Sequence, residues 1–142
     1  MKRKIITDIT YLKQKSEPVS LDELDNIVKD LEDSLDPKKG IGLTAIQIGI
    51  PLQVSIIRIP NKTPMNLYNA KIIEKQAPIK FRECCLSIPD LAIETRRYNS
   101  IVFENGDRQK YSADGIEAIV VQHEIDHMNG LTMLDRKWRK RR

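Results

Sequence analysis

The chain is poor in the residues that stabilise small secreted proteins and membrane proteins. Its two cysteines, Cys84 and Cys85, are adjacent among 142 residues, which excludes a disulfide framework because bridging neighbours closes almost no loop. No apolar run approaches the ~20 residues that a membrane-spanning helix needs. The basic segment 1–6 lacks the apolar stretch of a secretory signal. We therefore expect a cytoplasmic protein with reduced thiols and no membrane partner.

The bulk composition is ordinary for a folded protein. Hydrophobic residues make up 40% and charged residues 31% of the chain, as in typical globular proteins. The length predicts one domain over residues 1–142 with one core. Much of the net charge of +4 comes from a basic tail, residues 136–142, which is either a solvated terminus or an electrostatic contact with RNA.

Apolar spacing and capping residues predict two helices. Ser20 and Glu23 have the spacing of a capping box, and Pro37 would end the helix that follows. Its apolar stripe is expected to consist of Leu21, Leu24, Val28, Leu31 and Leu35. A second helix is predicted from a cap at Asp114 to a stop at Gly130.

Strands are predicted between these two helices. Residues 54–59 are rich in β-branched side chains and read as one strand. An Asn-Gly pair at 105–106 lies between residues 101–103 and a segment around Tyr111, which predicts a β-hairpin. Residues 61–82 are ambiguous, with short strand-like pieces around residues 72–73. The order of helix, strands and helix favours an α+β domain over a repeated βαβ array.

The second predicted helix carries His123, Glu124 and His127 as an HExxH motif. Positions four apart share one helix face, so both imidazoles can bind one metal ion. Glu124 projects about 100° from His123, which suits a general base beside the ion. Chance placement of two solvent-facing histidines is the competing interpretation. The apolar residues on the same face argue against it; they are Ile116, Ile119 and Val120.

HExxH alone leaves the reaction open, because a catalytic zinc site needs a third protein ligand and an open position. The chain has no third histidine, and only fifteen residues follow His127, so the cysteine pair is the best source. A zincin-like metallopeptidase and a structural zinc module with four protein ligands are the alternatives. Adjacent residues of a strand point to opposite faces, which disfavours binding by both Cys84 and Cys85.

Three segments together resemble the signature motifs of peptide deformylases. They are GIGLTAIQ at 40–47, ECCLS at 83–87 and QHEIDH at 122–127, against the usual forms GxGLAAxQ, EGCLS and QHExDH. Order and spacing match as well. Two departures are Thr44, where alanine is usual, and Cys84, where glycine is usual. The resemblance implies mixed or antiparallel β-sheets packed around a central HExxH helix, with an N-terminal helix.

The resemblance also assigns roles in removing the N-formyl group from the formylmethionine of nascent polypeptides. Cys85, His123 and His127 would bind one divalent metal, with ferrous iron as the physiological ion and zinc, nickel or cobalt as alternatives. Hydroxide from metal-bound water would attack the formyl carbon, with Glu124 as general acid/base. The Gln47 amide and the Leu86 N–H would stabilise the oxyanion, and formate would be released.

The remaining implied residues bind the peptide or support the site. Arg97 is expected to pair with Asp126 behind the metal ligands. The expected substrate-binding residues are Gly40, Ile41, Gly42, Glu83, Cys84, Ile116, Ile119 and Val120. A role in the plain core is the alternative for each of Ile41, Ile116, Ile119 and Val120.

The short C-terminal part resembles compact deformylases of organellar or phage type, which lack a long C-terminal helix. A phage origin would place the protein in the host cytoplasm, and an organelle is the alternative location. The basic tail predicts the ribosome as a partner.

Overall fold

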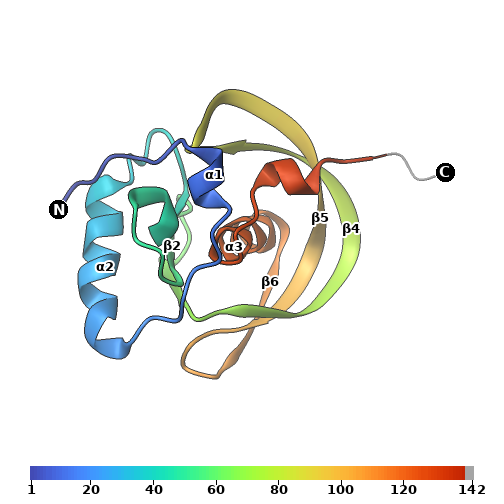
Figure 1. The fold of residues 1–142 in the computed structure, drawn as a ribbon. Coiled ribbons are helices and arrows are strands. Elements are labelled where there is room, and N and C mark those ends of the chain that lie inside the picture. Colours follow the sequence, from blue (N-terminus) through green and yellow to red (C-terminus); the bar gives the residue numbers. More distant parts are fainter. Residues whose placement is uncertain (140–142) are drawn as a thin grey trace.

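The computed structural model describes residues 1–139, in which short helices and antiparallel strands surround one buried helix (Figure 1). In chain order the elements are α1 (Ile9–Leu12), α2 (Leu21–Ser34), β1 (Gly42–Thr44), the 3-10 helix η1 (Ala45–Ile48), β2 (Val54–Ile57), β3 (Met65–Tyr68), β4 (Lys71–Cys85), β5 (Ile88–Glu104), β6 (Lys110–Asp114), α3 (Gly115–Met128) and the 3-10 helix η2 (Met133–Arg136).

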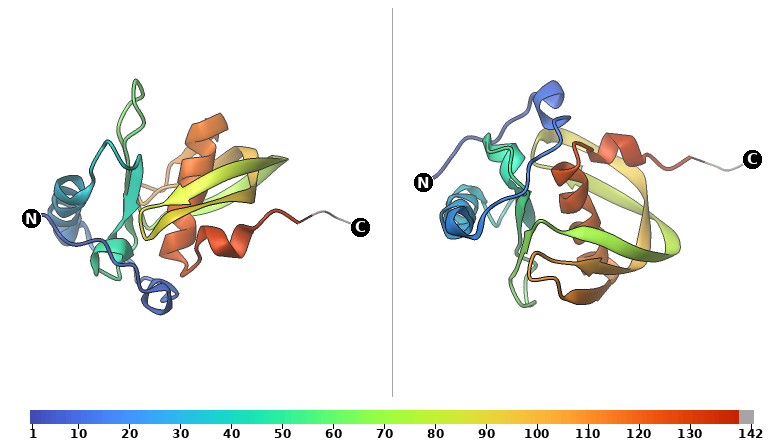
Figure 2. Two further views of the ribbon diagram at one scale, coloured as in Figure 1. Left: turned by 90° about the horizontal axis from the view of Figure 1, so that it is seen from above. Right: turned by 60° about the horizontal axis from the view of Figure 1, so that its bottom comes forward.

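Two three-stranded sheets enclose α3. The strand orders are β1-β2-β3 and β4-β5-β6, and all paired strands are antiparallel. Figure 1 looks nearly down α3, with β2 and α2 on one side and β4, β5 and β6 on the other. Figure 2 shows the same layers from two further directions. The α+β prediction, with a central HExxH helix and an N-terminal helix, is therefore confirmed.

Helix α2 begins after Ser20, as predicted, but the predicted capping box does not form. The Ser20 hydroxyl donates to the Glu23 carboxylate at 3.0 Å and caps no backbone N–H. The predicted apolar stripe is also wrong at its first position, because Leu21 is 73% exposed. The rest of the predicted stripe is confirmed, since Leu31 and Leu35 are buried and Leu24 and Val28 pack against the same core. Ile27 is a further buried residue that the prediction lacked.

The long β4–β5 hairpin is the largest element that the sequence analysis did not predict at its full length. Only short strand pieces near 72–73 and 101–103 were predicted, yet the two strands span 15 and 17 residues. The first eight residues of β4 are exposed or only partly buried, and burial alternates only over residues 79–85, so the strand lacks a continuous alternation of the kind that marks a half-buried strand. Cross-strand hydrogen bonds extend the exposed part of this hairpin, whereas Ile101 and Phe103 of β5 are buried in the core.

The predicted hairpin turn at Asn105 is confirmed, and it also joins the two sheets. The Asn105 N–H donates to Gln109 O at 3.1 Å within the turn. The Asn105 side chain accepts from Tyr68 N and donates to Asn66 O, both at 2.9 Å and both on β3. Gly106 packs against the Tyr68 ring, where a Cβ atom would lie 2.1 Å from a ring carbon. Glycine is therefore required for the close approach of these sheets.

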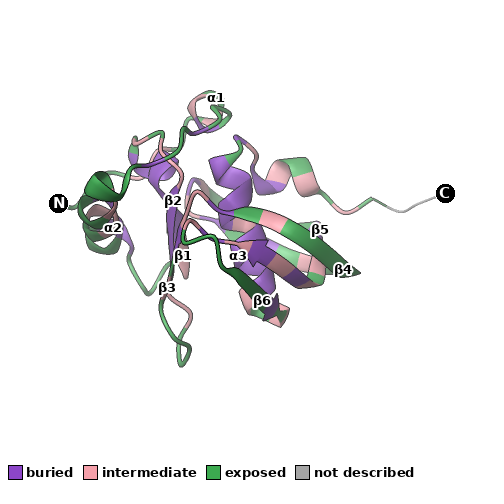
Figure 3. Ribbon diagram, turned by 90° about the horizontal axis from the view of Figure 1, so that it is seen from below, coloured by how far each residue is buried: buried purple, intermediate pink, exposed green. Residues whose placement is uncertain are grey.

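Helix α3 follows Asp114 as predicted, although the Asp114 side chain makes no capping hydrogen bond. The helix is buried on almost every side (Figure 3). The expectation of one apolar stripe is thus too narrow, since both sheets contact the helix. Ile116, the first residue of that stripe, is 37% exposed.

The start of the basic tail is bound to the body of the protein. Arg136 ends η2, Lys137 bridges to Thr95, and the Trp138 N–H donates to Glu94 O at 2.8 Å. The Trp138 ring lies beneath the side chains of Lys80 and Arg96. Residues 140–142, the rest of the predicted tail, lie outside the described residues.

Packing of α2 yields a matched pair of stability predictions. Leu31→Ala removes a side chain of 0% exposure and should lower the free energy of unfolding by about 2–5 kcal/mol. Leu21→Ala, in the same helix but exposed, should change it by less than about 0.5 kcal/mol. Urea unfolding measures both, and equal losses would contradict the packing of α2 described above.

Candidate metal centre and peptide cleft

The two histidines of α3 meet one cysteine at the end of β4. The ligand atoms of Cys85, His123 and His127 all lie within 4.8 Å of one another. Cys85 Sγ is 3.5 Å from His127 Nε2, which is 3.2 Å from His123 Nε2. Helical spacing brings the imidazoles together, and the paired β4–β5 hairpin brings the thiol to them.

This donor set suits a tetrahedral metal ion. Metal–nitrogen bonds of about 2.0–2.1 Å and a metal–sulfur bond of about 2.3 Å separate tetrahedral ligand atoms by about 3.3–3.6 Å. The sulfur–nitrogen separation of 3.5 Å lies within this range, and the nitrogen–nitrogen separation of 3.2 Å lies just below it. Three protein ligands leave one position open, as in catalytic sites. Cys84 is exposed, whereas Cys85 is buried, so the neighbouring thiol lies outside the cluster.

A buried ionic chain holds these ligands from behind. Glu83 Oε1 accepts from His123 Nδ1 at 2.8 Å and from Arg97 Nη2 at 2.9 Å. Arg97 also donates to Asp126 Oδ2 at 2.6 Å, so the expected Arg97–Asp126 pair is present. Arg136 donates to Asp126 Oδ1 at 2.9 Å. The hydrogen bond from His123 Nδ1 to Glu83 in this ionic network fixes the His123 ring with Nε2 directed toward the cluster.

Glu83 was expected to bind substrate, but its carboxylate is occupied within the protein. It is 4% exposed and bonds to Thr95, Arg97 and His123. Burial raises the pKa of Glu83, yet hydrogen bonds from Arg97 and His123 outweigh it and bring the pKa to about 2. The group is therefore a carboxylate at neutral pH. Any contact between Glu83 and a peptide would come from its backbone.

The imidazoles differ in their protonation. Burial, with the nearby His123, holds the pKa of His127 well below its usual range. Burial also lowers the pKa of His123, but hydrogen bonds with Cys85 and Glu83 raise it well above that range. The lowered pKa favours the neutral, metal-binding form of His127, whereas the raised pKa of His123 makes a proton compete with a metal ion for that ring.

Glu124 lies beside the cluster without belonging to it. Its Oε1 accepts from the Thr44 hydroxyl at 2.9 Å. A Cβ atom on Gly42 would lie 2.5 Å from its Oε2, so a larger residue at position 42 would displace the carboxylate. Burial raises the pKa of Glu124, and His123 and the Thr44 hydroxyl oppose that rise. A buried carboxylate of raised pKa suits proton transfer.

Gln47 is held next to the thiol ligand. Its Oε1 accepts from the Thr44 N–H at 2.9 Å, and its Nε2 donates to Ser87 Oγ at 3.0 Å and approaches Cys85 Sγ at 3.7 Å. Leu86 and Ser87 form the turn between β4 and β5. Gly40 packs against the Leu86 side chain, 2.9 Å from where its Cβ would be.

A cavity of about 1040 Å³ opens beside these residues. Its wall includes the 40–42 segment, the end of β4 and one face of α3. The predicted substrate residues Gly40, Ile41, Gly42, Glu83, Cys84, Ile116, Ile119 and Val120 all line it, together with Gln47, Cys85, Leu86, His123 and Glu124. Ile119 and Val120 are nearly buried, so they contribute to the core and to the cavity wall at once.

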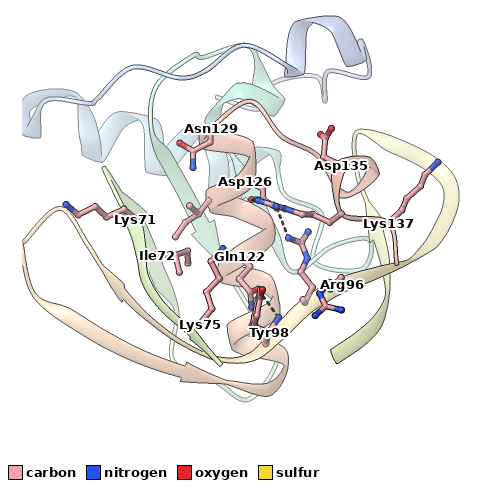
Figure 4. A pocket seen from close by; sticks show the side chains of 14 residues that line it. Lys71, Ile72, Lys75, Arg96, Tyr98, Gln122, Asp126, Asn129, Asp135 and Lys137 are labelled. Atoms are coloured by element: carbon pink, nitrogen blue, oxygen red, sulfur yellow. Dashed lines mark hydrogen bonds and ion pairs between the residues drawn. The ribbon is translucent and has the colours of Figure 1, made fainter. Parts of the chain in front are cut away.

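A second cavity of about 460 Å³ lies against another face of α3 (Figure 4). Asp126 and Gln122 reach it from the helix, and Arg96 and Tyr98 reach it from β5. Gln122 donates to Tyr98 O at 2.7 Å and accepts from Tyr98 N at 3.0 Å. These bonds hold β5 to the side of α3 that faces away from the metal cluster.

Sequence reasoning missed several supporting side chains. Ser87 was quoted only as part of a motif, and Ser55 as part of a strand. Arg136 belonged to a basic tail that was predicted to be solvated or to contact RNA, whereas in the structure it donates to Asp126. Arg136 reaches Asp126 only because the C-terminal segment folds back along α3. No local sequence pattern indicates that fold. Thr44 carried a visible signal, because it departs from the usual alanine.

Comparison with known proteins decides the family. The family model described as polypeptide deformylase matches residues 3–142. The chain belongs to the polypeptide deformylase family. Among curated relatives, a peptide deformylase of Aquifex aeolicus is 37% identical over 143 residues, covering 92% of this chain and 85% of its own.

Solved deformylases share the fold. A peptide deformylase from Legionella pneumophila is 30% identical with a TM-score of 0.88, covering 97% of this chain and 87% of its own. One from Thermotoga maritima is 26% identical with a TM-score of 0.86, covering 98% and 99%. Among the described residues, no helix is long and apolar enough to cross a membrane.

The ionic chain behind the ligands generates a prediction. Arg97→Met leaves the buried Glu83 carboxylate without its charged partner, which should cost about 3–5 kcal/mol of unfolding free energy. It should also weaken metal binding by freeing His123. Urea unfolding and a metal-competition titration measure the two effects.

Arg82→Met is the control, because Arg82 is an exposed residue of β4. Its effect on unfolding should stay within about 0.5 kcal/mol. If the Arg97 and Arg82 variants had the same unfolding free energy and the same metal affinity, the deformylase site would not depend on the buried ionic network around Arg97.

Proposed function

We propose that this chain is a metal-dependent amidohydrolase that removes the formyl group from N-formylmethionyl nascent polypeptides, with residues 1–142 as one catalytic domain. The observation that carries the proposal is the three-ligand cluster beside Glu124, at the wall of an open cavity. Membership of the deformylase family supplies the reaction class.

Two alternatives fit the geometry less well. A structural zinc module needs a fourth protein ligand, and the exposed Cys84 is not part of the ligand cluster. A zincin-like peptidase shares the helix motif but not the thiol donor from β4. The buried Gln47 and Glu124 also have no use in merely holding a metal.

Cys85, His123 and His127 are the proposed metal ligands. A thiolate with two imidazoles suits ferrous iron or zinc, with nickel and cobalt as substitutes, and we propose iron as the physiological ion. When bound, such an ion makes water acidic enough to supply hydroxide at neutral pH and polarises a carbonyl oxygen.

Glu124 is the proposed proton carrier. Its buried carboxylate would accept a proton from the attacking water and deliver it to the leaving amine, which frees the peptide N-terminus. The Gln47 Nε2 and the Leu86 N–H would donate to the formyl oxygen as negative charge develops on it. One such donor is typically worth about 3–4 kcal/mol of transition-state stabilisation.

The cavity wall suggests how a peptide binds. An extended chain between residues 40–42 and the end of β4 could hydrogen-bond to backbone on both sides. The methionine side chain would pack against Ile41, Ile119 and Val120, with Ile116 at the exposed rim. Cys84 would contact the peptide through its exposed side chain.

Location and further partners complete the proposal. We propose action in the cytoplasm, on chains leaving the ribosome. Lys137 and Arg139 are available for ribosome contact at low salt, together with the basic residues 140–142 of the sequence.

Formate release from a formyl-Met-Ala-Ser peptide tests the function. The protein is purified anaerobically with ferrous iron, and the reaction should yield formate and the free-amine peptide. Mass spectrometry of the products separates the alternatives. Cleavage of internal bonds would indicate a peptidase, and no reaction with any divalent ion would overturn the proposal.

Glu124→Gln should abolish turnover, by at least about 10²–10³-fold, because an amide cannot carry the proton. Metal content should remain near one ion per chain, since Glu124 lies outside the ligand cluster. Elemental analysis beside the formate assay checks both. Loss of metal together with activity would make Glu124 a ligand or a structural group.

The adjacent cysteines form a matched pair. Cys85→Ser should lower metal affinity by about 10²-fold or more and nearly eliminate activity, because the thiolate is replaced by a weaker donor. Cys84→Gly should keep the metal and its activity, with equal or better turnover of bulky peptides. If Cys84→Gly lost the metal while Cys85→Ser kept it, Cys84 rather than Cys85 would be the metal ligand.

A further inference from the structure

Thr44, where the family motif usually has alanine, contacts the side chain proposed to carry protons. The Thr44 hydroxyl lies 2.9 Å from Glu124 Oε1 and 2.6 Å from the Ser55 hydroxyl. Thr44 and Ser55 are both 0% exposed, and Glu124 is 3% exposed. The contact therefore forms away from solvent, where one hydrogen bond strongly restrains a carboxylate.

The strand register explains why these side chains meet. Thr44 on β1 pairs directly with Ser55 on β2, and directly opposed residues of antiparallel strands share one face of the sheet. That face contacts α3, where Glu124 lies. The pairing of β1 with β2 thus places the Thr44 and Ser55 hydroxyls side by side, and the Thr44 hydroxyl contacts Glu124 on α3.

The number of available protons decides which hydroxyl donates and which accepts in the Thr44–Ser55 pair. An ionised carboxylate only accepts hydrogen bonds, and each hydroxyl has one proton to donate. If Thr44 donates to Glu124, the short contact between the two hydroxyls must be a donation from Ser55 to Thr44. The alternative acceptor for Thr44, Glu124 O, is farther away at 3.3 Å. The directed chain is Ser55 to Thr44 to Glu124 Oε1.

The other carboxylate oxygen faces Gly42, two residues before Thr44. A Cβ atom on Gly42 would lie 2.5 Å from Glu124 Oε2 and would push the carboxylate aside. Residues 42–44 therefore provide a hydrogen-bond donor to one oxygen and leave space for the other.

We propose that Thr44, oriented by Ser55, is a positioning residue that fixes the Glu124 carboxylate for proton transfer. The inference rests on the proposed function of Glu124. Alanine at this position offers no donor, so this chain restrains its general base by an interaction that the usual motif lacks. The gain is orientation in the transition state rather than peptide affinity.

The test compares Thr44→Val with Thr44→Ser in the iron-loaded enzyme. Valine keeps the shape but removes the donor, and serine keeps the donor. Thr44→Val should lower kcat for the formyl peptide about tenfold, equivalent to about 1.4 kcal/mol in the barrier, with KM unchanged. Thr44→Ser should retain near-normal kcat. Ser55→Ala should cost less than Thr44→Val, because Thr44 can still donate.

Readouts other than activity keep the test independent. Metal content, and the affinity for the free-amine product peptide, should be unchanged in all three variants. A crystal structure of Thr44→Val should show the Glu124 carboxylate turned from its place. Normal kcat in Thr44→Val, an equal loss in Thr44→Ser, or an unmoved carboxylate would overturn the inference.

Failure of the proposed function gives a different pattern. It would appear as absence of formate release in the wild-type enzyme, before any variant is compared. The carboxylate position in the Thr44→Val crystal structure would still decide whether Thr44 positions Glu124.

Discussion

The guanidinium of Arg97 lies between two carboxylates, Glu83 on β4 and Asp126 on α3. All three proposed metal ligands belong to these two elements, since Cys85 ends β4 and the histidines lie on α3. Moving the helix against the strand would therefore separate the thiol from the imidazoles and break the Arg97 pairs together. Buried ion pairs contribute little net stability because desolvation offsets their attraction. The value of this one is geometric, because it fixes where two distant segments meet.

The same arrangement explains which parts of the fold the sequence predicts. Helices α2 and α3 have local signals in their caps and apolar spacing, and both were located within a few residues. The HExxH motif and the adjacent cysteines indicated the ligand cluster for the same reason. The first half of β4 had no comparable signal, because residues 71–78 are exposed or only partly buried and are held by pairing with β5. Local sequence patterns indicate which side chains are buried. This hairpin is instead defined by hydrogen bonds between residues far apart in the chain, which such patterns do not report.

The supporting residues were hidden for a related reason. Arg136 reaches Asp126 only because η2 folds back along α3, and Ser55 meets Thr44 only through the register of β1 and β2. Neither relation can be read from a single segment. Motifs identify groups that need particular chemistry, whereas the residues that orient those groups can come from any element that packs nearby. Thr44 stood out in advance because it replaces a usual residue within a motif.

The separation of Cys85 and His127 by 42 residues has a consequence for the order in which the protein matures. His123 and His127 can approach one ion as soon as a single helix forms, but the thiol joins them only after the long hairpin has closed and α3 has docked between the sheets. Pairing of distant segments is the slow part of folding. The complete ligand set therefore exists only after the hairpin and α3 have come together, whereas the two histidines alone need one helix.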